Sequence, residues 1–125
     1  MEALTRTTGQ SAMLPGAVIA GNLVFTSGVV APQALAAIGT DVRVPVSEQI
    51  ISAVEALMGI LADAGAGPAQ VVKIEAYLDS TEGLADWNEA FLKLWPQPGP
   101  ARTTLVAGFT SPAISFELQA IASIA

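Results

Sequence analysis

Cysteine and histidine are both absent from the 125 residues of this chain. Without cysteine there is no disulfide framework, no thiolate nucleophile and no cysteine-ligated metal site. Without histidine the chain lacks the usual general base near neutral pH and the commonest metal ligand. Any chemistry must therefore use arginine, lysine, carboxylates, tyrosine, hydroxyls, backbone groups and water.

Positive charge is scarce as well. The chain has 5 Lys and Arg against 11 Asp and Glu, which gives a formal net charge of −6. The basic residues are scattered singly between Arg6 and Arg102, whereas a polyanion-binding surface needs clustered Lys and Arg. Nucleic acid and anionic membranes are therefore not expected as partners.

Long apolar runs and targeting signals are also missing. No run reaches the ~18–20 residues of a membrane span. Residues 1–6 are too polar for a secretory signal peptide. These features predict a soluble, cytoplasmic protein.

Apolar surface, in contrast, is abundant. Hydrophobic residues make up 52% of the chain and charged residues only 13%, about half the usual ~25%. The length suits one domain, which we place at residues 1–125. So much apolar surface excludes disorder, and so little charge disfavours a monomer. We therefore expect an oligomer.

Hydrophobic periodicity divides the chain into strands and helices. Apolar spacings of three and four predict helices over residues 46–64 and 84–95, the first ended by Gly65. Alternation and turn residues predict five strands, over residues 18–20, 23–26, 71–78, 101–106 and 114–124. Residues 4–8 are a candidate extra strand, and residues 29–41 are either a loop or a loop containing a helical turn. The order predicts an α+β fold, a mixed β-sheet with two helices packed on one face.

The strand at 71–78 is expected to have a dry face and a partly polar face. The residues predicted to face the core are Val72, Ile74, Ala76 and Leu78. The residues predicted to form a polar cross-strand ladder are Lys73, Glu75 and Tyr77. Val71 would share that second face, which a further subunit is expected to cover.

Two charged residues are candidates for chemistry. Arg102 lies at the entry to a strand, where a guanidinium could grip a carboxylate with two hydrogen bonds; the alternative is a surface salt bridge. Glu117 lies between Phe116 and Leu118, where desolvation would raise its pKa and favour proton transfer; the alternative is the solvated face of an edge strand. If the two strands are neighbours, both residues meet in one cleft.

The helix at 84–95 carries further candidates. Asn88 shares a face with Trp87 and Phe91, and we interpret it as a hydrogen-bonding partner of backbone across the helix–sheet seam. Trp87, Phe91 and Trp95 are interpreted as core or interface rather than as a ligand box.

Several motifs occur together in a distinctive order. Residues 100–105 read PARTTL and residues 114–118 read ISFEL, preceded by related stretches at 21–28, 62–65 and 71–79 and by Asn88. From about residue 16 to residue 124, the chain resembles the RidA (YjgF/YER057c/UK114) family. The resemblance implies a chorismate-mutase-like α+β fold and a homotrimer with sites in the clefts between subunits.

The resemblance also implies a reaction. Better-known members hydrolyse reactive enamines and imines, such as 2-aminoacrylate, to 2-keto acids and ammonia. Arg102 would hold the substrate carboxylate, and Glu117 would help to position or activate water. This chemistry needs no metal and no cofactor, because the imine is intrinsically labile and positioning suffices.

The candidate site has one catalytic and five substrate-binding positions, namely Glu117 and then Arg102, Thr104, Asn88, Leu14 and Ser27. Leu14 stands where active members commonly carry a tyrosine, and Thr104 stands where cysteine is frequent. Three functions stay open: an imine/enamine deaminase, a non-catalytic homotrimer that binds a small carboxylic acid through Arg102, and a ribonuclease or translation inhibitor. Negative charge and the absence of histidine count against the third.

Overall fold

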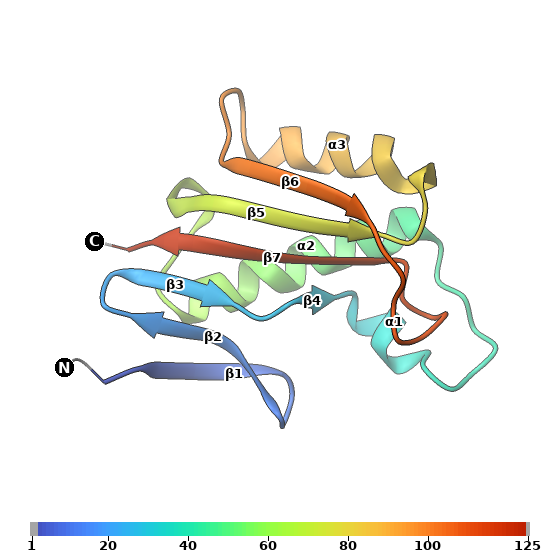
Figure 1. Cartoon of the computed structure of the whole chain (residues 1–125), viewed down its shortest axis with the longest axis horizontal. Helices are drawn as coiled ribbons and strands as arrows, with labels where there is room; N and C mark the ends of the chain where they lie inside the picture. The colour runs from blue at the N-terminus through green and yellow to red at the C-terminus, as the bar shows by residue number, and fades with distance from the viewer. Residues whose placement is uncertain (1–2, 125) are drawn as a thin grey trace.

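The computed structural model describes residues 3–124 as a mixed β-sheet with helices packed on one face (Figure 1). The strands are β1 (Thr5–Ser11), β2 (Leu14–Ala20), β3 (Leu23–Thr26), β4 (Val29–Val30), β5 (Val71–Leu78), β6 (Ala101–Val106) and β7 (Phe116–Ser123). The helices are α1 (Pro32–Ala36), α2 (Val46–Asp63) and α3 (Leu84–Leu94), with 3₁₀ turns at Pro68–Gln70 and Thr81–Gly83. The predicted α+β class is confirmed.

The order of strands in the sheet decides what can meet at a site. The order is β1-β2-β3-β7-β5-β6, and β4 also pairs with β7. β5 and β6 are parallel, whereas the other pairs are antiparallel. β3 and β4 therefore act as one strand along β7, interrupted at Ser27 and Gly28. β5 separates β6 from β7.

Local sequence signals set the turns. Gly21 has a φ of +59° in the β2–β3 hairpin, and Gly65 has a φ of +86° just after α2. Both are left-handed conformations that glycine adopts without strain, so the predicted hairpin and helix end are confirmed. The segment 29–41 contains β4 and α1, where Pro32 begins the helix. The helical-turn alternative was therefore correct, and a short strand was missed.

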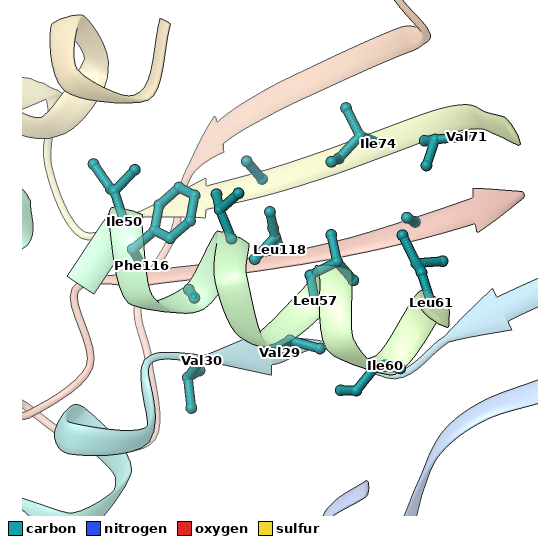
Figure 2. Packing of buried hydrophobic residues seen from close by; sticks show 14 of the residues in the cluster. Val29, Val30, Ile50, Leu57, Ile60, Leu61, Val71, Ile74, Phe116 and Leu118 are labelled. Carbon is teal, nitrogen blue, oxygen red and sulfur yellow. The ribbon is translucent and has the colours of Figure 1, made fainter. Parts of the chain in front are cut away.

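The core lies between the sheet and α2 (Figure 2). Ile50, Leu57 and Leu61 recur on one side of α2 and are almost fully buried, as the periodicity predicts. They face Phe116 and Leu118 of β7, which are also fully buried. α3 packs beside α2, and among residues 3–124 no helix covers the opposite face of the sheet (Figure 1).

One strand alternation was predicted wrongly. Val72 was assigned to the core but is 47% exposed, while Val71 is 6% exposed and belongs to the core. The pairing of β5 with β7 shifts register between Val71 and Lys73. Such a bulge inserts an extra residue and exchanges the faces on one side of it.

A buried glutamine joins α2 to the segment that leads into β7. Gln49 is 1% exposed, and its Nε2 donates to the carbonyl oxygens of Val44 at 2.9 Å and Ala113 at 3.2 Å. Its Oε1 accepts from the backbone nitrogen of Ser115 at 2.9 Å. Gln49 thus fixes the backbone two residues before Glu117.

We expect Gln49→Leu to lower the free energy of unfolding by about 2–4 kcal/mol, because buried backbone groups lose their partners. Urea unfolding at pH 7 measures the change. Glu48→Leu, at the exposed neighbouring position, is the matched control. Equal stabilities of Gln49→Leu and wild type would contradict the role of Gln49 in fixing this backbone.

Candidate functional site

Arg102 lies on the helix side of the sheet. Its register partner on β5 is Ile74, which is fully buried under the helices. The Arg102 Cζ lies 5.4 Å from the ring centroid of Trp87 and 4.9 Å from that of Phe91, both on α3. These distances are within the range of cation–π attraction. The aromatic residues predicted as core therefore also form a wall around the arginine.

Two polar side chains orient the guanidinium. Arg102 Nε donates to Thr104 Oγ1 at 3.0 Å, and Arg102 Nη2 donates to Asn88 Oδ1 at 2.6 Å. Trp87 Nε1 donates to the same hydroxyl oxygen at 3.0 Å. The partner of Asn88 is therefore the guanidinium, so the expectation of a backbone contact was wrong.

Arg102 forms no ion pair within residues 3–124, where the one salt bridge joins Lys93 to Glu89. The salt-bridge alternative for Arg102 is therefore wrong. Burial lowers the pKa of the guanidinium from its ordinary value, but arginine stays cationic at neutral pH. Two of its five N–H groups donate to protein atoms. The other three have no hydrogen-bond partner within residues 3–124.

Glu117 lies on β7, on the face of the sheet opposite the helices. Its neighbours Phe116 and Leu118 point into the core, so alternation turns Glu117 away from it. β7 is bordered by other strands on both sides, so the edge-strand alternative is wrong. Burial raises the pKa of the Glu117 carboxyl above its usual value.

Gly28 makes room for that carboxylate. A Cβ added to Gly28 would collide with Glu117 Oε2 and stand 2.9 Å from Cδ. The residue lies in the gap between β3 and β4, opposite β7. Glycine is needed here for close approach rather than for a positive φ. Gly28 belongs to the motif at residues 21–28, but that motif does not predict the contact with Glu117.

A hollow of about 300 Å³ borders Glu117. It lies between the β1–β2 hairpin, α1 and the segment Ser27–Val30, and Leu14 and Ser27 are in its wall. Ser27 Oγ donates to the Pro15 carbonyl oxygen at 2.7 Å, which holds the segment to β2. Three of the six predicted site residues therefore share this hollow.

Gln10 was missed by sequence reasoning. Its Nε2 donates to the Val30 carbonyl oxygen at 2.6 Å, and its Oε1 accepts from the Val30 nitrogen at 3.0 Å. The amide thereby pairs with β4 as a strand would and closes one side of the hollow. No sequence signal predicts a contact over 20 residues of this kind.

The predicted meeting of Arg102 and Glu117 does not occur within one chain. Their register partners on β5 are Ile74 and Tyr77, three residues apart and thus on opposite faces. Two strand spacings and three residue rises also separate the two Cα atoms by about 14 Å. The expectation failed because β5 lies between the two strands. The six predicted residues form two groups, one with Arg102 and one with Glu117.

Polar residues on the open sheet face form the predicted cross-strand ladder. Tyr77 Oη donates to Glu75 Oε2 at 2.9 Å, and Gln119 Nε2 donates to the same oxygen at 2.9 Å. The hydrogen bond from Gln119, and to a smaller extent that from Tyr77, lowers the pKa of the Glu75 carboxyl. Lys73 Nζ donates to Thr103 Oγ1 at 3.0 Å. The ladder lies beside Glu117, since Tyr77 is its register partner.

No helix within residues 3–124 is long and apolar enough to cross a membrane. In the same part of the chain, no three acidic side chains come together as a metal-ligand cluster.

Comparisons with known proteins agree with this architecture. The sequence model of the family described as Endoribonuclease L-PSP matches residues 9–124. The fission yeast (Schizosaccharomyces pombe) protein mmf2, named as mitochondrial, is 34% identical over 110 residues, or 86% of this chain and 84% of that protein. A RutC family protein of Pyrococcus abyssi is 29% identical over 108 residues, or 85% of this chain and 82% of that protein.

Solved structures share the fold. A YjgF/YER057c/UK114 family member from Mycobacterium tuberculosis superposes with a TM-score of 0.81 at 19% identity, covering 98% of this chain and all of that one. Yeast Mmf1 also gives 0.81, at 22% identity and with the same coverage. The chain belongs to the YjgF/YER057c/UK114 (RidA) family, which its motifs resemble.

The raised pKa of Glu117 predicts a pH-dependent effect of Glu117→Gln. The folded state binds this proton more tightly than the unfolded chain, so ionisation of Glu117 costs stability above the unfolded-state pKa of ~4.3. The variant should therefore be more stable than wild type at pH 7, with a smaller gain at pH 4.

Urea unfolding at the two pH values measures this difference. Glu55→Gln, at an exposed position on α2, controls for the loss of one negative charge. A gain from Glu117→Gln that is as large at pH 4 as at pH 7 would contradict the desolvation of this carboxyl.

Proposed function

We propose that the protein hydrolyses reactive 2-imino and enamine acids to 2-keto acids and ammonia, in a cleft between two copies of the chain. The observation that carries this proposal is the state of Arg102. It is a partly buried cation, fixed by Asn88 and Thr104, with free N–H groups and no carboxylate partner within residues 3–124. A planar guanidinium held in this way suits the carboxylate of a small acid.

The second copy supplies the other half of the site. Arg102 and Glu117 of one chain face opposite sides of the sheet, so one small ligand reaches both only if they come from different subunits. The open sheet face and the free edge of β6, where Leu105 and Val106 are more than half exposed, favour such association. We propose a homotrimer, the assembly that the family resemblance implies.

The proposed reaction is the addition of water to the C=N bond of the imine, followed by loss of ammonia. An enamine first takes a proton from solvent at carbon and loses one from nitrogen to solvent, and thereby becomes the imine. Glu117 accepts a proton from water as the water oxygen bonds to the imine carbon, and the electrons of the C=N bond pass to nitrogen, which takes a proton from solvent. Protonated Glu117 then returns its proton to the carbinolamine nitrogen, the C–N bond breaks to release ammonia, and the hydroxyl proton passes to solvent as the C=O bond forms. Because burial raises the pKa of Glu117, its carboxylate is a stronger base.

The matching family model is described as an endoribonuclease, but the composition of this chain argues against RNA cleavage. RNA cleavage favours a basic groove and a matched acid–base pair. This chain has a net charge of −6 and no histidine. The proposed reaction uses only the carboxylate, arginine and water, and we place it in the cytoplasm, as the sequence analysis predicts.

Release of keto acid and ammonia from an imino acid generated in place tests the proposal. Wild type should exceed the no-protein rate, and the catalysed rate of Glu117→Gln should be about 10²–10⁴-fold lower than that of wild type. Binding of a 2-keto acid to Glu117→Gln, followed by calorimetry, should persist, because Arg102 makes the carboxylate contact.

Arg102→Lys is the complementary variant. It keeps the charge but loses the two-bond fork, so affinity for the keto acid should fall about 10- to 150-fold. If wild type matches the no-protein rate for short, branched and aromatic imino acids, the deaminase is excluded. Retained keto-acid binding would then leave the carboxylate-binding trimer.

A further inference from the structure

The Glu117 carboxylate borders two hollows of similar size. The first, of about 300 Å³, has the β1–β2 hairpin and α1 in its wall; the second, of about 260 Å³, contains Tyr77 and Phe109. Glu117, Thr110 and Ile114 border both. A substrate whose reacting carbon lies beside Glu117 must direct its substituent into one of these spaces. Their walls therefore select among substrates.

The first hollow has an aliphatic wall. The side chains that form it are Leu14, Val30, Leu35, Ile38, Ile60 and Ile114. Leu14 is 50% exposed and Ile38 is 45% exposed, so both offer uncovered apolar surface at the opening. Glu117 is the one charged residue in the wall of this hollow.

Two of the four polar, uncharged side chains in the wall of the hollow are already engaged as donors, and the other two, Ser11 and Thr110, are exposed hydroxyls. Both ends of the Gln10 amide bond the backbone of Val30. The Ser27 hydroxyl donates its proton to the Pro15 carbonyl oxygen. A polar or anionic substituent would therefore find only these two hydroxyls as donors and no cation in exchange for its hydration, while an apolar substituent would gain contacts with the aliphatic wall.

We infer that this aliphatic pocket receives the substrate side chain, and that the preferred substrates are 2-imino acids with branched or extended aliphatic side chains. The inference rests on the proposed function, because it places the reacting carbon beside Glu117. A methyl group leaves most of a 300 Å³ hollow unfilled. Each further buried CH₂ strengthens binding by about fourfold. Leu14, at the opening, is the residue we assign to this selection.

Calorimetry with three stable 2-keto acids tests the pocket without requiring catalysis. We expect 4-methyl-2-oxopentanoate to bind at least about tenfold more tightly than pyruvate, because three more carbons are buried. The dianion 2-oxoglutarate, similar in length, should bind no better than pyruvate, because the pocket wall places a carboxylate and no cation near it.

Leu14→Asn tests the assigned residue, because asparagine has the same number and branching of side-chain heavy atoms but is polar. It should reduce the ratio of the affinities for 4-methyl-2-oxopentanoate and pyruvate by about threefold or more. Met13→Asn is the matched control, because Met13 is in the same turn, is 84% exposed and lies outside the pocket wall. Equal losses of preference in both variants would overturn the role of Leu14.

Turnover of the corresponding imino acids separates this inference from the proposed function. Equal affinity for the three keto acids, or faster turnover of the alanine-derived imine than of the leucine-derived one, overturns the aliphatic pocket and leaves the deaminase standing. An aliphatic preference in binding without turnover above the no-protein rate supports the pocket and overturns the deaminase. Absence of binding by all three acids overturns both.

Discussion

The position of β5 between β6 and β7 is the constraint on which the account depends. It places Arg102 and Glu117 on opposite faces of one sheet and two strands apart. No rotamer change brings their side chains to one small ligand, because the sheet itself lies between them. A site that uses both residues therefore belongs to an interface, and association of subunits becomes part of the chemistry rather than a contribution to stability alone.

Each half of the site is ordered within its own chain. Aromatic rings on α3 and two hydrogen bonds orient Arg102 before a ligand arrives. On the other face, Gly28 leaves space for the Glu117 carboxylate, and Gln49 fixes the backbone that leads to it. Such preorganisation lowers the cost of binding, because few rotamers remain to be fixed when the ligand enters. In the proposed oligomer, assembly would then only have to bring two preorganised halves together.

Local patterns in the sequence predicted most of the helices and strands. They did not predict the pairings between segments that are distant along the chain. The apolar spacing of α2, the glycines that end helix and hairpin, and the motif residues Arg102 and Glu117 could all be identified within short windows. The exchange of Val71 and Val72 depends on a bulge against β7, and the pairing of Gln10 with Val30 joins distant segments. Strand order is likewise a property of the whole fold, so the sequence predicted that Arg102 and Glu117 meet only if their strands are neighbours, and β5 lies between those strands.

Mixing two inactive variants tests the interface site most directly. Arg102→Lys and Glu117→Gln are each expected to be severely impaired, but a refolded 1:1 mixture creates interfaces that combine an intact Arg102 with an intact Glu117. Random assembly gives such an interface in about one quarter of cases. The account predicts that deaminase activity of the mixture recovers toward about one quarter of the wild-type rate. Activity that stays at the average of the two separate variants, although mixed oligomers have formed, would contradict it.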